Sequence, residues 1–172
     1  YVSSVCFSHD GRHLFSAGAD QSVRQWDAET GRCIRTFDGH TRHVASVGLT
    51  ANGRTLLTGS DDGTLRLWDT GTGRCLQVLD LGAEQVFTAA LSGDGRLAAC
   101  AFTSKVFGAS GTGIELWDVG SKRKRGALSG HSAATKVVAL SADGQWAASG
   151  GDDKTVRLWD ATSLRELKLM QG

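Results

Sequence analysis

The chain has 172 residues, of which 40% are hydrophobic and 22% are charged, an ordinary composition for a soluble globular protein. Its 19 Lys and Arg residues against 18 Asp and Glu residues give a formal net charge of +1, which argues against a dominant electrostatic attraction to nucleic acid or acidic lipid. No apolar run approaches the roughly 18 residues that a membrane-spanning helix requires.

The four cysteines show neither a CxxC pair nor the spacing with histidine that a metal site requires. They are Cys6, Cys33, Cys75 and Cys100. We therefore expect buried free thiols in a reducing, cytoplasmic compartment, and neither a metal nor a cofactor. The chain begins with Tyr1 and not with Met, so we expect it to be part of a longer protein.

Short apolar runs separated by glycine turns predict an all-β chain, because 23 glycines occur and no proline does. The second unit shows the pattern, with expected strands at residues 44–49, 55–59, 64–68 and 74–79. Its first two strands are separated by Asn52-Gly53, and the other units carry Asp10-Gly11, Asp94-Gly95 and Asp143-Gly144 at this place. Such a dipeptide predicts a two-residue hairpin turn with positive φ.

A Trp-Asp dipeptide recurs along the chain with spacings of 42, 49 and 42 residues. The four copies are Trp26-Asp27, Trp68-Asp69, Trp117-Asp118 and Trp159-Asp160. A period in the low forties with four short strands in each unit is the requirement of a propeller blade. Internal repetition is therefore the strongest signal in the sequence.

With these dipeptides in register, the chain from Val2 to about Gln171 resembles the WD-repeat β-propeller family. The resemblance implies an all-β fold of four four-stranded blades, as part of a seven- or eight-bladed ring. It places the blades at residues 1–38, 43–80, 85–129 and 134–171, within a single propeller segment covering residues 1–172.

In this family, a buried hydrogen-bonded set in each blade usually joins a His, a Ser or Thr, an Asp and the Trp. Two repeats match at every position, and the first lacks the His, which would precede Tyr1. The matching residues are His40, Thr58, Asp62 and Trp68; His131, Ser149, Asp153 and Trp159; and Ser16, Asp20 and Trp26. Because the set repeats, we interpret it as structural and expect no catalytic residue.

The third repeat departs from this pattern. Leu81-Gly82 stands where Gly-His is expected, Cys100 replaces the hydroxyl residue and Gly111 replaces the Asp, so that Trp117 alone remains. Seven additional residues fall within residues 102–110. We expect the connection between the second and third strands to be the most irregular one here.

The resemblance also implies a partner-binding face, formed by the connections between blades and those between the second and third strands. The corresponding residues are Tyr1, Ser3, Ala19, His43, Ala45, Asp61, Gln85, Phe87, Ser110, Ala134, Lys136 and Asp152. We favour Tyr1, His43 and Phe87 as anchors, because aromatic residues dominate the binding energy of many interfaces.

Two further features allow alternative interpretations. The run Lys122-Arg123-Lys124-Arg125 is interpreted as a solvated outermost strand, and the alternative is a binding site for nucleic acid or another anionic partner. Trp146 lies outside the Trp-Asp dipeptides and is expected to pack in the core.

Four blades in an open arc would leave two apolar faces exposed. Three arrangements cover them: the remaining blades of a longer chain, a second copy of this chain, or closure of the four blades on themselves. From all this, the sequence predicts a non-catalytic protein–protein interaction scaffold, a regulatory or sensor module of a larger protein.

Overall fold

The computed structural model describes residues 1–83, 85–103 and 112–171, which form 16 strands and no helix. Each run of four consecutive strands makes one antiparallel sheet. The predicted all-β class with four four-stranded blades is confirmed. No helix in the described residues is long and apolar enough to cross a membrane.

The strand bounds follow the sequence repeat. The first sheet contains β1 (Val2–Phe7), β2 (His13–Gly18), β3 (Val23–Asp27) and β4 (Cys33–Phe37). The second contains β5 (Val44–Leu49), β6 (Thr55–Ser60), β7 (Thr64–Asp69) and β8 (Cys75–Asp80). The third contains β9 (Gln85–Leu91), β10 (Leu97–Thr103), β11 (Thr112–Asp118) and β12 (Arg123–Leu128). The fourth contains β13 (Thr135–Leu140), β14 (Trp146–Gly151), β15 (Thr155–Asp160) and β16 (Glu166–Gln171).

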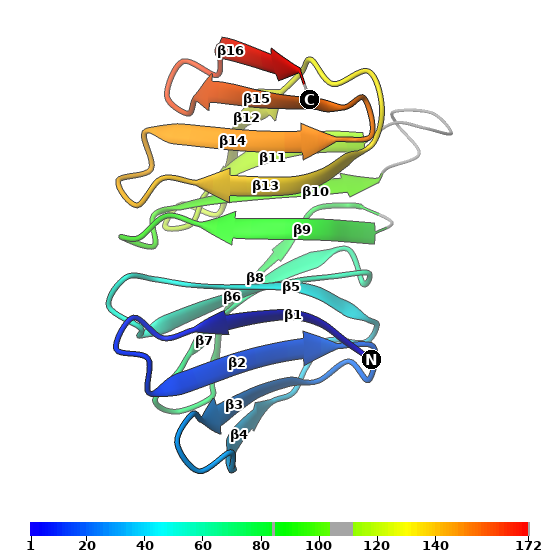
Figure 1. Ribbon diagram of the computed structural model, residues 1–172. Coiled ribbons are helices and arrows are strands. Elements are labelled where there is room, and N and C mark those ends of the chain that lie inside the picture. Colours follow the sequence, from blue (N-terminus) through cyan, green and yellow to red (C-terminus); the bar gives the residue numbers. More distant parts are fainter. Residues whose placement is uncertain (84, 104–111, 172) are drawn as a thin grey trace.

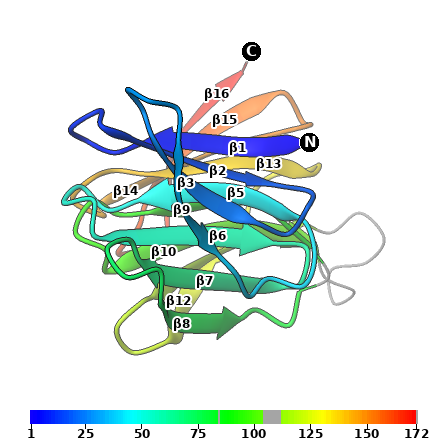
Figure 2. The ribbon, with the colours of Figure 1, turned by 90° about the horizontal axis from the view of Figure 1, so that it is seen from below.

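The four sheets are stacked in chain order, with the first sheet at the bottom of Figure 1 and the fourth at the top. Figure 2 looks along this stack, with the first sheet nearest to the viewer and β16 farthest away. The first strand of each sheet contacts the first strand of the next, so β1, β5, β9 and β13 lie side by side. This order is that of consecutive propeller blades.

Alternating side chains bury both faces of an inner sheet. In β7, Leu65 and Leu67 pack against the third sheet, whereas Trp68 packs against the first. Such alternation is the consequence of the two-residue period of a strand. Three apolar cores result, one between each pair of neighbouring sheets.

The outer faces of the first and fourth sheets carry apolar residues at the same positions, but no other described sheet packs against them. Val44 in the second sheet is fully buried, whereas its counterpart Val2 in the first is 65% exposed. Leu65 is fully buried, whereas its counterpart Val156 in the fourth sheet is 48% exposed. The faces of the first and fourth sheets thus have the chemistry of an interior blade surface and lie open to solvent.

The hairpin turn between the first two strands is longer than predicted. A two-residue primed turn requires positive φ at its first central residue, and in type I′ at both, but in this turn Gly11 has a positive φ and Asp10 does not. The connection runs from Ser8 to Arg12, since Ser8 N donates to His13 O at 2.9 Å. Asp10 Oδ1 accepts from Ser8 Oγ and from Arg12 N, so side-chain hydrogen bonds stabilise the wider turn.

Two other predictions about burial were wrong. Cys33 and Cys75 are exposed at the start of outermost strands, and only Cys100 is buried. Trp146, predicted to be a core residue, is 42% exposed on β14. The next residue, Ala147, packs against the third sheet, so Trp146 lies on the open face of the fourth sheet, against which no other described sheet packs.

The irregular connection expected in the third repeat lies at residues 104–111, outside the described residues. The strands beside it pair in continuous register, from Leu97 opposite Asp118 to Thr103 opposite Thr112. Both strands have seven residues, one more than their counterparts in the second sheet.

We predict that Gly63→Ala lowers the free energy of unfolding by about 2–4 kcal/mol. Gly63 has a φ of 82°, and an added Cβ would meet the carbonyl oxygen of Ala83. Gly11→Ala is the matched control, because Gly11 has a φ of 69° with no atom within 4 Å of the added Cβ. It should cost about 1 kcal/mol in urea denaturation. Equal losses in the two variants would contradict the packing described.

Candidate functional site

The complete polar set of the second sheet is brought together in one buried chain of hydrogen bonds. The His40 ring lies 2.8 Å from Asp62 Oδ2 through Nδ1 and 2.7 Å from Thr58 Oγ1 through Nε2. Trp68 Nε1 donates to the same Thr58 hydroxyl at 2.9 Å. A neutral His40 that donates from Nδ1 and accepts from Thr58 satisfies every one of these groups.

The fourth sheet repeats this geometry. His131 Nδ1 lies 2.9 Å from Asp153 Oδ2, His131 Nε2 lies 2.8 Å from Ser149 Oγ, and Trp159 Nε1 donates to Ser149 Oγ at 2.9 Å. Burial opposes ionisation of Asp153, but hydrogen bonds from Thr155, His131 and neighbouring backbone groups outweigh it and lower its pKa.

In the first sheet, the predicted set is divided. Trp26 Nε1 donates to Ser16 Oγ at 2.8 Å, as expected for this pair. Asp20 lies apart from them and instead accepts from Ser22 Oγ and pairs with Arg24 at 2.8 Å on the surface. Among the described residues, no hydrogen bond links Asp20 to Ser16 or Trp26, so the placing of Asp20 in the set was wrong; in the second and fourth sheets a His makes this link.

Burial and hydrogen bonding set the charge states of the second-sheet pair. Burial lowers the pKa of His40 below its ordinary value, and the hydrogen bond and charge of Asp62 oppose that shift without overcoming it. The pKa of Asp62 is also lowered, because hydrogen bonds from Thr64, His40 and Thr41 outweigh the effect of burial. Near neutral pH, the contact therefore joins a neutral ring to a carboxylate.

The third sheet satisfies its tryptophan in a way that the sequence reasoning missed. Trp117 Nε1 donates to Glu115 Oε2 at 3.0 Å, and the other oxygen of Glu115 binds Lys124 Nζ. Cys100 lies directly opposite Glu115 on the neighbouring strand, and burial raises the pKa of its thiol. Trp117 is thus not an isolated remnant of the set.

A reversal of charge in the sequence could have revealed this arrangement. The residue two positions before the Trp is Arg24, Arg66 or Arg157 in the other repeats and Glu115 in the third. In the fourth sheet, Arg157 Nη1 donates to Glu166 Oε2 at 2.6 Å. The third sheet has the same pair of positions with the two signs exchanged.

On the expected partner-binding face, one group of residues joins the first two sheets. The rings of Tyr1 and His43 lie 5.4 Å apart between centroids. His43 Nε2 lies 2.5 Å from Ser3 Oγ, and His43 Nδ1 lies 3.2 Å from Asp61 Oδ2. Ala19 N donates to Tyr1 O at 3.0 Å. We call Tyr1, Ser3, His43 and Asp61 the first cluster.

A second group joins the third and fourth sheets. Lys136 Nζ lies 5.4 Å from the ring centroid of Phe87 and 3.1 Å from Asp152 Oδ2. Asp152 N donates to Ala134 O at 2.8 Å. We call Phe87, Lys136 and Asp152 the second cluster.

Five predicted residues belong to neither cluster, and Ala19 and Ala134 are two of them, since they contact the clusters only through the backbone hydrogen bonds above. Gln85 pairs with Thr103 and lines a hollow of about 450 Å³ together with Asp61. Ala45 occupies the irregularity in the pairing of β5 with β6. Ser110 lies outside the described residues. The strand ends that carry the two clusters lie on the right of Figure 1, as the N-terminus does.

The basic run lies where the solvated-strand interpretation placed it. Lys122 is in a turn with a φ of 59°, and Arg123 begins β12, the outermost strand of the third sheet. The charge of Lys124 is engaged with Glu115. Among the described residues, no group of three or more His, Cys, Asp or Glu side chains could hold a metal ion.

The sequence profile of the family "WD domain, G-beta repeat" matches residues 1–27, 31–69 and 122–160, which make up more than half of the chain. A probable E3 ubiquitin ligase complex SCF subunit sconB from Aspergillus terreus is 46% identical over 44 residues, covering 26% of this chain and 6% of that protein. The general transcriptional corepressor TUP1 from Saccharomyces cerevisiae is 37% identical over 46 residues, covering 27% and 6% respectively. The chain thus aligns with only a small part of each relative.

We predict that His40→Ala lowers the free energy of unfolding by about 1–3 kcal/mol, because Thr58 and Asp62 lose their buried partner. His9→Ala is the control, since His9 is exposed and such changes usually lie within about 0.5 kcal/mol. Urea denaturation measures both variants. An unchanged stability for His40→Ala would contradict the structural role.

The wild type and His40→Ala, compared at different pH values, test the lowered pKa of His40. Below the ordinary histidine pKa of about 6.5, the unfolded chain binds a proton that folded His40 does not accept, so the stability contributed by the neutral ring falls as the pH falls. The difference between wild type and His40→Ala should therefore shrink from pH 7.5 towards pH 5.5. A difference that grows over this range would contradict the assignment.

Proposed function

Because the chain belongs to the family "WD domain, G-beta repeat", we propose that it is a non-catalytic scaffold that binds protein partners through the face bearing the two clusters. Rigid sheets with side chains gathered at one end provide such a recognition surface. The relatives support this role by their names, since one is a subunit of a ubiquitin ligase complex and the other a transcriptional corepressor.

The observation that carries the proposal is the first cluster. His43 is held from two sides, by Ser3 of the preceding sheet and by Asp61 of its own sheet. Its ring faces Tyr1, which is 85% exposed. An exposed aromatic residue beside an already positioned ring can bind a partner with little loss of side-chain entropy.

The contacts of Ser3, His43 and Asp61 follow the order of a nucleophile, a base and an orienting carboxylate. Acyl transfer also depends on a water-excluded site with donors aimed at the developing oxyanion. Ser3 and Tyr1 instead lie exposed on an outer surface. We therefore assign these contacts to positioning the His43 ring, and we expect no labelling of Ser3 by a fluorophosphonate.

We further propose that the chain is a regulatory or sensor module of a larger cytoplasmic protein. The free thiols of Cys33 and Cys75 support a reducing compartment, because both are exposed and would be open to oxidation elsewhere. The open faces of the first and fourth sheets would then be covered by further blades of the same protein or by a second copy of this chain.

The second candidate is binding of nucleic acid or another anion through Lys122 to Arg125. The exposed β12 supports it, but the engagement of Lys124 with Glu115 removes one cation from the run. Salt-dependent retention on heparin that is lost when the four residues are replaced by Ala would favour this candidate over the scaffold.

The proposal is tested by affinity purification from cells of the source organism, with wild type, His43→Ala and Arg123→Ala as baits. We expect a set of proteins whose retention falls about tenfold with His43→Ala, because truncation of an interface anchor commonly costs that much. Arg123→Ala, on the outermost strand of the third sheet, should retain them. Thermal unfolding checks that both variants are folded.

Two outcomes would contradict the proposal. In the first, His43→Ala retains every protein that wild type retains. In the second, retention is lost with Arg123→Ala or after nuclease treatment, which would support the anionic partner instead.

A further inference from the structure

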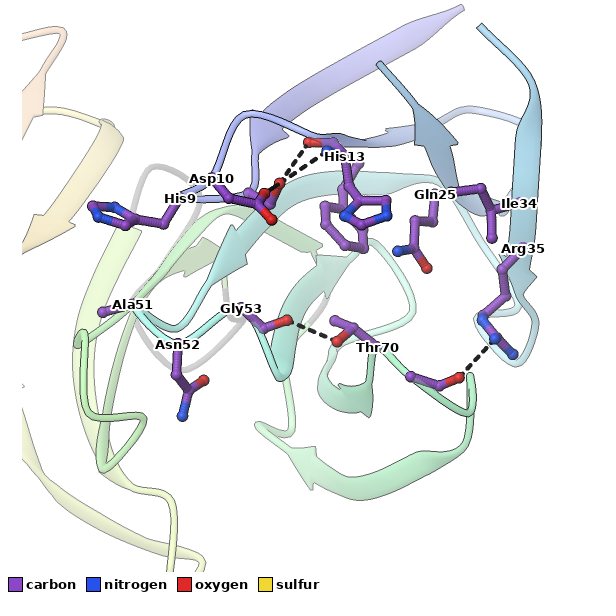
Figure 3. A pocket seen from close by; sticks show the side chains of 13 residues that line it. His9, Asp10, His13, Gln25, Ile34, Arg35, Ala51, Asn52, Gly53 and Thr70 are labelled. Carbon is purple, nitrogen blue, oxygen red and sulfur yellow. Dashed lines mark hydrogen bonds between the residues drawn. The ribbon is translucent and has the colours of Figure 1, made fainter. Parts of the chain in front are cut away.

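A cleft of about 540 Å³ lies between the first and second sheets at the end opposite to the two clusters. Figure 3 shows its walls, which include the turn at His9 and Asp10, the side chains of Gln25 and Arg35, and the turn at Asn52 of the second sheet. Its volume lies within the range of about 300–1,000 Å³ that is typical of ligand sites.

Gln25 distinguishes this cleft from the corresponding places between the other sheets. The residue immediately before the Trp-Asp dipeptide is Leu67, Leu116 or Leu158 in the other repeats. Gln25 is only 8% exposed, and its Oε1 is buried without a hydrogen-bond partner. An unpartnered buried acceptor is unfavourable and rare in folded proteins, so a ligand that supplies a donor is its natural complement.

Arg35 places an unpartnered donor beside this acceptor. Gln25 lies directly opposite Phe15 on one neighbouring strand and Arg35 on the other, so the three side chains share one face of the sheet. Arg35 Nη2 donates to Gly71 O at 2.7 Å, whereas Arg35 Nε is buried without a partner. In the second sheet, Gln77 makes the equivalent contact to Val119 O at 2.8 Å.

We propose that the cleft binds an extended peptide segment of a partner protein, separately from the partner-binding face. Once side-chain rotation turns these two buried atoms towards the cleft, a main-chain N–H would donate to Gln25 Oε1 and a neighbouring carbonyl would accept from Arg35 Nε. A peptide chain carries one donor and one acceptor in each residue, which matches this pair. An apolar side chain of the peptide would cover Ile34, which lines the cleft and is 46% exposed.

The other repeats supply the variants for the test. Gln25→Leu introduces the residue that stands before Trp68, and it replaces an unpartnered polar side chain, so we expect an unchanged or higher Tm. Arg35→Gln introduces the residue that the second sheet has at this position, Gln77, whose Nε2 donates to Val119 O of the next sheet. The change removes the Arg35 Nε donor. Both variants should therefore fold.

Random peptides displayed on phage are selected on the wild-type chain, and the enriched peptides are synthesised for titration. We expect peptides whose Kd rises about tenfold in Gln25→Leu and in Arg35→Gln, the effect of losing one buried hydrogen bond. The Kd should be unchanged in His43→Ala, because the first cluster lies at the opposite end.

The His43→Ala and Gln25→Leu variants separate binding at the partner-binding face from binding in the cleft. Peptides that lose affinity in His43→Ala and bind equally to Gln25→Leu would overturn the cleft proposal and leave the scaffold intact. The absence of any peptide sensitive to Gln25→Leu would overturn it as well.

Discussion

The hydrogen bond of the indole N–H in each Trp-Asp dipeptide is the interaction on which the rest of the structure depends. A large ring can fill the space between two sheets only if its single donor finds an acceptor there. Thr58 and Ser149 provide it in the second and fourth sheets, where His and Asp extend the chain of bonds. In the third sheet, Glu115 provides it from the same strand as Trp117. The residue that accepts the hydrogen bond differs between these sheets, but in each of them the indole N–H of the Trp-Asp dipeptide is hydrogen-bonded.

Stiff sheets explain why both ends of the strands can carry binding groups. The hydrogen bonds from His40 tie the connection before β5 to β6 and to the turn after it, so the strand ends are held from several sides. The first cluster uses this rigidity to hold His43 between two sheets. At the opposite end of the strands, Gln25 stands where the other repeats have leucine and presents a polar group to the cleft.

Features that repeat could be predicted from the sequence, whereas features that belong to one repeat could not. The recurring Trp-Asp dipeptide defined the strands and sheets, because each copy supports the others. The length of the hairpin turns depends on side-chain hydrogen bonds such as the one from Ser8 to Asp10. The Asp-Gly dipeptide, from which a two-residue turn was predicted, gives no information about these bonds. The exposure of Trp146 depends on which sheet lies beside it, and the partners of Glu115 and Gln25 depend on the register of neighbouring strands.

Hydrogen exchange of the indole N–H groups, followed by NMR, tests the central claim most directly. Trp68 and Trp159 are 1% exposed and hydrogen-bonded, whereas Trp146 is 42% exposed, so the chain contains its own reference. The account predicts that the N–H groups of Trp68 and Trp159 exchange only with global unfolding, while that of Trp146 exchanges rapidly. Equally rapid exchange at all three would show that the indole hydrogen bonds do not hold the sheets.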